Sequence, residues 1–408
     1  MQDYNPEQAI LTARREFGEF GGVTPSIARA STFTVLDPDE MSCLFEGTKG
    51  PDIDKSYLYS RHFNPTVNLL SRYLAAMEGT EAAVCTASGM AAISCTLMQL
   101  CKAGDHIISS NAIYGGTYAL LDKLLPEMNI STTFVDPVNI DEIKAAIRPE
   151  TKVIFAETAG NPILKVTDIP VIAGIARENN LTFVVDNTFM PMIISPAVLG
   201  ADIVIYSMTK FINGASDLLS GAICADKSFI NRLMDLHTGR AMLFGPTMDP
   251  RCAFDIIQRL PHLALRMKEH SRRAQAIAEA LFSLNVPVTY PGLPSFPQYE
   301  TISALINRGY GYGGLLTVDC LTREKAGEFL SYLQNKMQFG LIAVSLGYFD
   351  TLMSCSGSST ASEINPDDQQ KMGLSNGLVR MSIGLTGSLE ERVNQIESTV
   401  KALRMNCI

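Results

Sequence analysis

The stretch Ile203-Val-Ile-Tyr-Ser-Met-Thr-Lys210 joins a short apolar run to a polar turn that carries one lysine and two hydroxyl residues. A second apolar run, Leu181-Thr-Phe-Val-Val-Asp186, precedes it and ends on an acid. Such runs are typical of strands that are buried on both faces of a parallel sheet. Open α/β sheets bind ligands at the carboxyl ends of their strands, so these two runs predict a site at that edge.

The lysine and the aspartate in these runs suit one kind of chemistry. A lysine buried at a strand end has a lowered pKa, because burial disfavours the charged ammonium. Unprotonated, Lys210 can form a Schiff base with an aldehyde cofactor such as pyridoxal 5'-phosphate (PLP). Asp186 on the neighbouring strand can keep a pyridine nitrogen protonated, which makes the ring an electron sink. The two runs alone are also compatible with a solvated lysine and a helix-capping aspartate.

The composition is that of an ordinary globular enzyme. The 408 residues are enough for two or three domains, with 46% apolar and 18% charged residues. The net charge of −9 offers no basic surface for nucleic acid, and no apolar run is long enough to span a membrane. The first residues lack the basic and apolar regions of a signal peptide, so we expect a cytoplasmic protein without nucleic-acid or membrane partners.

The cysteines and histidines do not indicate a metal centre. The chain has nine cysteines and no CxxC pair, which is typical of reduced thiols in a cytoplasmic protein. Most of them, such as Cys85 and Cys320, stand in apolar contexts and are expected to be core residues. The five histidines show no paired spacing, so we expect no metal site.

Alternating strands and helices over about 80–225 predict an α/β fold with a mostly parallel sheet and helices on both faces. The expected strands are 83–86, 105–110, 132–135, 153–157, 181–186, 203–206 and 221–225. A long helix over 251–284, broken near Pro261, then leads to a smaller α+β unit, with strands expected at 314–320, 341–345 and 377–384. We therefore divide the chain into an N-terminal arm that contacts a partner subunit (1–60), a cofactor-binding large domain (61–260) and a C-terminal domain (261–408).

Several turns of the large domain carry residues that suit a flat, phosphorylated cofactor. Ser88, Gly89 and Met90 open a helix, where backbone amides and the helix dipole favour an anion. Tyr114 precedes two glycines and can lay its ring against a planar cofactor, or it is a packed loop residue. Asn161 follows a strand and can hydrogen-bond a ring substituent.

Tyr59 and Arg61 stand just before a predicted helix. A guanidinium beside a phenol suits a phosphate oxygen, because its fork donates two charge-assisted hydrogen bonds. Taken alone, Arg61 fits an ordinary surface arginine better than a phosphate ligand.

Together these motifs make the chain resemble the PLP-dependent Cys/Met-metabolism (trans-sulfuration) family, and within it the methionine γ-lyase branch. The match runs from about Thr24 to the last helix. The motifs that carry it are Tyr-Ser-Arg-x-x-Asn-Pro-Thr at 59–66, Ala-Ser-Gly-Met at 87–90, Tyr-Gly-Gly-Thr at 114–117, Glu-Thr-x-Gly-Asn-Pro at 157–162, Val-Asp-Asn-Thr at 185–188 and Ser-x-Thr-Lys at 207–210.

The resemblance implies the fold of type I PLP enzymes and a homotetramer built from two tight dimers. It implies that Lys210 binds PLP covalently, Asp186 pairs with the pyridinium nitrogen, and Tyr114 stacks on the ring and acts in catalysis. The remaining cofactor and substrate contacts that it implies are phosphate contacts from Ser88, Gly89, Met90, Ser207 and Thr209, phosphate contacts across the dimer from Tyr59 and Arg61, a ring contact from Asn161, and substrate contacts from Tyr114, Ser345 and Arg380.

The resemblance also implies a choice between two reactions. Val344 stands where relatives that handle cystathionine often carry a glutamate, and an apolar residue there suits an apolar thioether. We therefore expect γ-elimination on methionine or another γ-substituted amino acid, giving 2-oxobutanoate and ammonia. The alternative is γ-replacement on an O-acylhomoserine. A dinucleotide-binding module is the competing class, but the chain lacks a GxGxxG turn with an acid downstream.

The sequence departs from the family pattern in three places. Ala215-Ser-Asp217 replaces the usual His-Gly-Asp run after the lysine, and the stretch 354–362 lacks the usual histidine. Gly116 stands where methionine γ-lyases characteristically have a cysteine.

Overall fold

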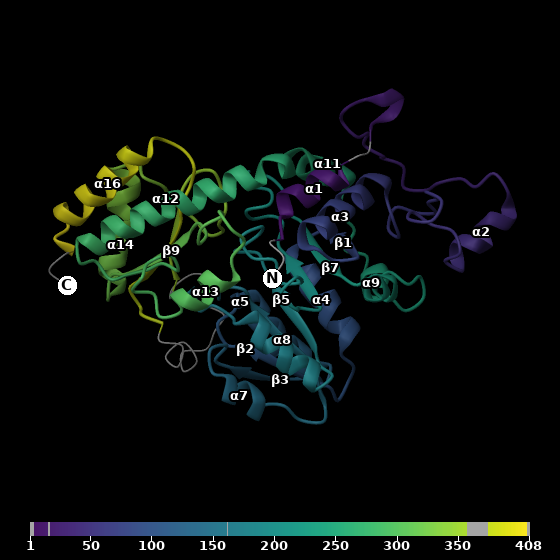
Figure 1. Ribbon diagram of the computed structural model, residues 1–408, viewed down its shortest axis with the longest axis horizontal. Coiled ribbons are helices and arrows are strands. Elements are labelled where there is room, and N and C mark those ends of the chain that lie inside the picture. Colours follow the sequence, from purple (N-terminus) through teal and green to yellow (C-terminus); the bar gives the residue numbers. More distant parts are fainter. Residues whose placement is uncertain (1–3, 15–16, 161, 357–373, 406–408) are drawn as a thin grey trace.

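A computed structural model describes residues 4–14, 17–160, 162–356 and 374–405 of the chain. Within these ranges the strands form one sheet of seven strands and one of five. The seven-stranded sheet lies in the body of the molecule, and the five-stranded sheet lies at the far end of the long helix α12 (Figure 1). The predicted combination of a large α/β unit with a smaller α+β unit is therefore confirmed.

The large sheet has the strand order β1-β7-β6-β5-β4-β2-β3. Its parallel part runs from β6 to β3, as the sequence predicts. Strand β7 is antiparallel to both β1 and β6, because the connection after Lys210 contains no crossover helix that would return the chain in parallel. The bounds are β1 (Ala82–Thr86), β2 (His106–Ser110), β3 (Ser131–Val135), β4 (Thr151–Glu157), β5 (Thr182–Asp186), β6 (Ile203–Tyr206) and β7 (Gly221–Ala225).

Capping residues set the ends of the helices near the site. Asn64 caps α3 by accepting hydrogen bonds from two backbone amides, Pro65 begins the helix, and Gly79 ends it with a φ of 81°. The helices of the large unit are α3 (Pro65–Glu78), α4 (Gly89–Leu100), α5 (Gly115–Ala119), α6 (Leu125–Glu127), α7 (Ile140–Ala145), α8 (Ile169–Glu178), α9 (Lys227–Leu233), α10 (Arg240–Phe244) and α11 (Pro250–Arg259).

The expected break at Pro261 is a 3-10 turn, Leu260–His262, between α11 and α12 (Leu263–Ser283). The start of α12, with Leu263 and Met267, belongs to the core of the large unit, whereas Ile277 belongs to the core of the small one. Since α12 contributes to both cores, the boundary between 260 and 261 stays a prediction.

The small sheet has the order β10-β11-β12-β9-β8. The prediction of a strand over 341–345 was too long, because only Leu341 and Ile342 pair and Ser345 has a φ of +91° that a strand does not allow. Strand β11 and helix α13 were not predicted. The bounds are β8 (Val288–Thr289), β9 (Leu315–Asp319), β10 (Leu341–Ile342), β11 (Leu352–Cys355), β12 (Leu378–Ser382), α13 (Tyr299–Leu305), α14 (Arg323–Asn335) and α16 (Leu389–Ala402).

The N-terminal segment is largely irregular, as predicted, apart from α1 (Pro6–Ala13) and α2 (Pro38–Phe45). The part that carries α2 extends away from the body of the molecule (Figure 1). Some apolar side chains of the N-terminal segment are almost fully exposed: Phe20 is 99% exposed and Leu36 is 97% exposed. An exposed apolar surface of this kind favours contact with another protein surface.

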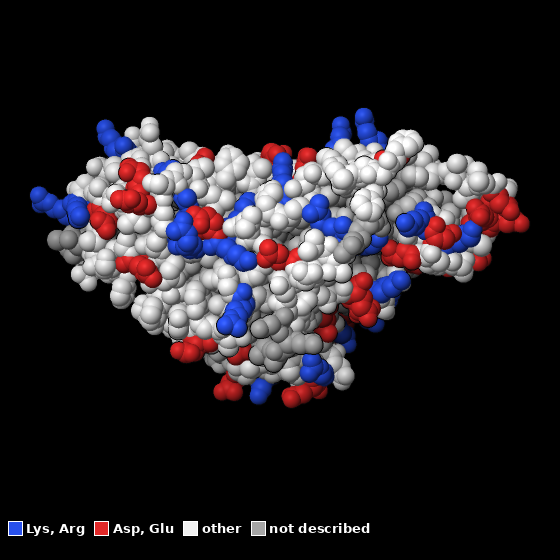
Figure 2. Space-filling view, turned by 45° about the horizontal axis from the view of Figure 1, so that its top comes forward, with Lys and Arg blue, Asp and Glu red and all other residues white. Residues whose placement is uncertain are grey.

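Basic and acidic side chains are interspersed on the face shown in Figure 2, and they do not gather there into one basic area. None of the helices in the described part of the chain has the length and apolar character that crossing a bilayer requires.

Candidate active site

A cleft of about 440 Å³ opens at the carboxyl ends of the central strands of the large sheet. Residues of the small unit close its other side. The structure brings most of the predicted site residues together there. The cleft is lined, among others, by the predicted residues Ser88, Gly89, Met90, Tyr114, Asp186, Ser207, Thr209, Lys210, Ser345 and Arg380.

Lys210 lies on a helical turn directly after β6. Its backbone amide donates to the Ser207 carbonyl at 3.2 Å, and its side-chain Nζ donates to Ser345 Oγ at 2.7 Å. Burial lowers the pKa of Lys210 to about 8, and the nearby positive charge of Arg380 contributes to the shift. Much of this amine is therefore neutral at mildly alkaline pH, which is the form that reacts with an aldehyde.

Asp186 ends β5 beside this lysine. Its Oδ1 accepts hydrogen bonds from the Thr188 amide at 2.9 Å and from Thr188 Oγ1 at 2.5 Å. Burial raises the pKa of Asp186 to about 6, although the Thr188 hydrogen bonds favour the charged form. The carboxylate is thus held in one orientation in a low-dielectric site, where a cationic partner such as a pyridinium N–H is strongly favoured.

Ser345 connects the lysine to the small unit. Its Oγ accepts from Lys210, and its carbonyl accepts from Arg380 Nη2 at 2.9 Å. Arg380 is buried on β12, and burial lowers its pKa to about 10. The negative charge of Glu157 acts in the other direction and raises the pKa of Arg380. A buried guanidinium facing the cleft is a bidentate partner for a substrate carboxylate.

The backbone of Ser345 leads to a prediction about stability and activity. A non-glycine residue at this positive φ costs roughly 1–3 kcal/mol, so Ser345→Gly is expected to raise the free energy of unfolding by about 1 kcal/mol. Both Ser345→Gly and Ser345→Ala remove the acceptor of Lys210, so both are expected to lower kcat about tenfold. Urea unfolding and initial rates test this. A Gly variant no more stable than the Ala variant contradicts it.

The start of α4 and the turn before Lys210 form a cradle for an anion. A Cβ atom added to Gly89 would lie 2.6 Å from Ser207 Cβ, so only glycine allows the two segments to approach this closely. Thr209 lines the same region, and its Oγ1 donates to the Ser220 carbonyl at 3.2 Å and accepts from the Ser220 amide at 2.9 Å. The buried Ser220 Oγ has no hydrogen-bond partner among the described residues. The backbone amides at the start of α4 and the hydroxyls beside them fit the phosphate of PLP. Asp186 fits the ring nitrogen of PLP, and Lys210 fits its aldehyde.

Tyr114 lies at the rim of the cleft, 46% exposed, and its backbone amide donates to Glu157 Oε1 at 2.6 Å. A Cβ atom at Gly116 would lie 2.5 Å from the Tyr114 ring. The ring therefore occupies the space that a cysteine would need at this position, which gives the departure at Gly116 a physical reason.

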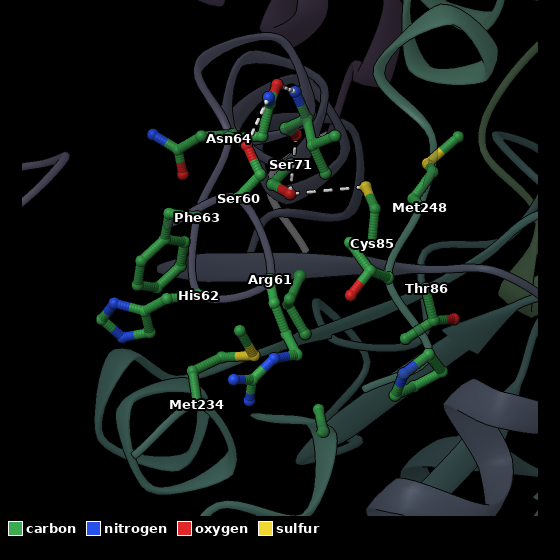
Figure 3. A pocket seen from close by; sticks show the side chains of 16 residues that line it. Ser60, Arg61, His62, Phe63, Asn64, Ser71, Cys85, Thr86, Met234 and Met248 are labelled. Atoms are coloured by element: carbon green, nitrogen blue, oxygen red, sulfur yellow. Dashed lines mark hydrogen bonds between the residues drawn. The ribbon is translucent and has the colours of Figure 1, made fainter. Parts of the chain in front are cut away.

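Two of the predicted site residues that the structure describes do not line this cleft. Arg61 lies in a separate small pocket (Figure 3). Its Nη1 donates to the Met242 carbonyl at 3.1 Å, and its guanidinium lies 5.5 Å from the Tyr59 ring. Tyr59 does not line the cleft either. Asn161 lies outside the described residues, as do positions 357–362 of the divergent stretch.

The prediction from sequence missed residues that also line the cleft. Glu157 ends β4 next to Asp186, so the strand-end argument that found the aspartate could have found it. Thr188 orients Asp186, and the pattern gives no sign of this role. The apolar lining residues Phe189, Leu219 and Leu346 carry no chemical signature in the sequence.

Comparison with known proteins agrees with this geometry. The family model of the Cys/Met metabolism PLP-dependent enzymes matches residues 8–402. A methionine gamma-lyase of Arabidopsis thaliana is 51% identical over 97% of this chain and 90% of its own length. An L-methionine gamma-lyase of Fusobacterium nucleatum subsp. polymorphum is 34% identical over 94% of this chain and 95% of its own.

Solved structures show the same fold. A cystathionine gamma synthase from Xanthomonas oryzae pv. oryzae superposes with a TM-score of 0.87 at 28% identity, covering 98% of this chain and 99% of that one. A putative O-acetylhomoserine (thiol)-lyase from Campylobacter jejuni subsp. jejuni, with a TM-score of 0.88 at 26% identity over 98% and 100% of the two chains, carries a pyridoxyl-lysine monophosphate. The predicted fold class and the predicted cofactor are thereby confirmed, and this chain belongs to the Cys/Met-metabolism family of PLP-dependent enzymes.

Proposed function

We propose that this protein catalyses γ-elimination on methionine or a related thioether amino acid, as a cytoplasmic homotetramer. The observation that carries the proposal is the lining of the cleft, to which Val344, Leu346 and Leu219 contribute apolar side chains together with Lys210 and Arg380. An apolar wall favours a methylthioether over the charged head of a second amino acid, because an unpaired charge is costly to desolvate.

Substrate binding follows from the charges of the cleft. The Arg380 guanidinium binds the substrate carboxylate and thereby points the Cα atom toward Lys210. The side chain of the substrate then extends along the apolar wall. The sequence similarity to methionine gamma-lyases over nearly the whole chain supports this orientation and the reaction type.

Bound PLP supplies an electron sink that stabilises negative charge at the carbon atoms of the substrate. Lys210 would take the proton from Cα and pass it to C4′ of the bound cofactor, which returns the amine to its neutral form. The neutral amine can then take a proton from Cβ, and its lowered pKa suits it to both transfers. The Tyr114 phenol gives a proton to the departing sulfur. Addition of water balances the reaction: methionine and water give 2-oxobutanoate, ammonia and methanethiol.

A substrate panel tests the proposed function. Methionine, cystathionine, homocysteine and O-acylated homoserines are supplied with and without a thiol, and 2-oxobutanoate and new thioether are measured. We expect 2-oxobutanoate from methionine without added thiol. Rapid thioether formation from O-acylhomoserine, with no 2-oxobutanoate from methionine, would show that the enzyme is a γ-replacement enzyme instead.

Val344 offers a matched pair of variants for the same assay. Val344→Glu introduces a partner for a distal amino group and is expected to raise the kcat/KM ratio of cystathionine over methionine about tenfold. Val344→Leu keeps the wall apolar and should leave the ratio unchanged. If the kcat/KM ratio of cystathionine over methionine is the same in the two variants, Val344 does not determine the substrate specificity.

The exposed arm and the position of Arg61 support a site shared between subunits. If Arg61 reaches the phosphate of a partner, a dimer of one Arg61→Ala and one Lys210→Ala subunit contains one intact site, and verified hybrids are expected to recover about half of the wild-type activity. The matched control pairs a wild-type subunit with a subunit that carries both Arg61→Ala and Lys210→Ala, because this dimer has an intact site only if Arg61 acts within its own chain. No recovery in the first hybrid would show that Arg61 acts within its own chain.

A further inference from the structure

The central strands of the large sheet end in pairs of polar or hydroxyl residues. In each pair one residue lines the cleft and its neighbour does not, which is the alternation expected of an extended chain. The cleft residues are Glu157, Asp186 and Ser207, and the neighbours are Thr158, Asn187 and Tyr206. All three neighbours are buried, as is Glu78 on α3.

Hydrogen bonds join these four buried residues into a row. Thr158 Oγ1 donates to Asn187 Oδ1 at 2.8 Å, and Asn187 Nδ2 donates to the Tyr206 hydroxyl at 2.9 Å. Tyr206 in turn donates to Glu78 Oε2. Every donor points toward Glu78, so each bond polarises the next one in the same direction.

The end of the row is suited to an acceptor with two oxygens. Glu78 Oε1 accepts from the Ala197 amide at 3.0 Å, while Oε2 accepts from Tyr206. Burial raises the pKa of Glu78 to about 8, and both hydrogen bonds act against that rise. A glutamine at this position has a single acceptor oxygen for two donors, so it cannot satisfy both.

The row also connects to the site in front of it. The Thr158 amide donates to the Asp186 carbonyl at 3.0 Å. On the next strand, the Ser207 amide donates at 2.8 Å to Thr188 Oγ1, the hydroxyl that holds the Asp186 carboxylate. Displacement of Tyr206 or Asn187 therefore moves the backbone that orients Asp186 and Ser207.

We propose that Glu78, Tyr206, Asn187 and Thr158 form a positioning network that holds Asp186 and Ser207 in register against the cofactor. None of the four lines the cleft, so they act through the residues beside them. The kinetic part of the inference rests on the proposed function, and the part that concerns cofactor binding stands without it.

Tyr206→Phe and Glu78→Gln, singly and together, test the network. Each single variant is expected to raise the dissociation constant of PLP about tenfold and to lower kcat about tenfold with little change in KM. The pH midpoint of the absorbance of bound PLP is expected to shift in both. Because the two residues share one hydrogen bond, the double variant should lose less than the product of the single losses.

Val204→Ala is the matched control, since Val204 lies on the same strand, is fully buried and makes no side-chain hydrogen bond. It is expected to lower Tm and to leave the PLP affinity and the pH midpoint unchanged. If the Tyr206 and Glu78 variants do not fold, Thr158→Val against Thr158→Ser gives the same comparison, with only the serine retaining function.

The outcomes separate this inference from the proposed function. Network variants that lose stability but keep the wild-type PLP affinity and pH midpoint would show that the row is only structural. If the losses of Tyr206→Phe and Glu78→Gln simply multiply in the double variant, the proposed network is overturned as well. An enzyme that fails to cleave methionine but shows the expected changes in PLP binding would contradict the proposed substrate and leave the network intact.

Discussion

Replacing Lys210 with alanine is expected to abolish covalent binding of PLP and to lower kcat by roughly 10⁴-fold or more. The Lys210 amine is the group in the cleft that can both react with an aldehyde and carry protons, and alanine does neither. Absorbance of the purified protein and single-turnover kinetics measure the two losses. A Lys210→Ala protein that keeps the colour and rate of the wild type would refute the assignment.

Two further variants separate the chemistry of this lysine from its charge. Lys210→Arg keeps a cation but cannot lose a proton at working pH, so it should be as inactive as the alanine variant. Lys144→Ala removes an exposed lysine on α7 and is expected to have no effect.

The lowered pKa of Lys210 gives a pH dependence with a definite sign. Burial disfavours the ammonium, so the neutral amine forms at lower pH than for an ordinary lysine, and labelling of Lys210 in the apoprotein should rise with a midpoint of about 8. If the labelling of Lys210 and of the surface lysines rises with the same pH midpoint, Lys210 does not have the lowered pKa that its burial predicts.

Asp186→Asn is expected to leave the fold intact and to lower kcat by roughly 10²- to 10³-fold. Asparagine keeps the shape and can still accept from Thr188, but it carries no charge to hold a pyridine nitrogen protonated. The measurement is kcat and KM with methionine, together with the absorbance spectrum of the bound cofactor.

Asp202 provides the control for that variant. It is a partly buried acid of the same sheet at the opposite strand ends, where it accepts from the Phe183 amide at 2.7 Å. Asp202→Asn is expected to affect stability alone. If Asp186→Asn and Asp202→Asn behave alike, the carboxylate of Asp186 has no special role in the reaction.

The centre of the site could be predicted because the ends of buried strands can be recognised in the sequence. Apolar runs that end in Asp186 or lead into Lys210 identify both the strands and the edge at which their polar groups meet. The same argument applies to Glu157, which the prediction passed over in favour of Asn161, a residue outside the described ranges.

Features that depend on tertiary contacts could not be predicted in this way. Nothing in the sequence around Ser345 indicates a positive φ, which the contacts to Lys210 and Arg380 impose. The row of hydrogen-bonded residues behind the site could not be predicted either. Glu78 lies more than a hundred residues from Tyr206 along the chain, and only the fold brings them together.

Reduction of the PLP-loaded protein with borohydride, followed by peptide mapping, tests the central claim most directly. The reduction fixes the cofactor to the amine that it was bound to, and mass spectrometry then identifies the peptide. The account predicts one phosphopyridoxyl group per chain, on Lys210. A modified lysine elsewhere, or no modification of a protein that cleaves methionine, would contradict it.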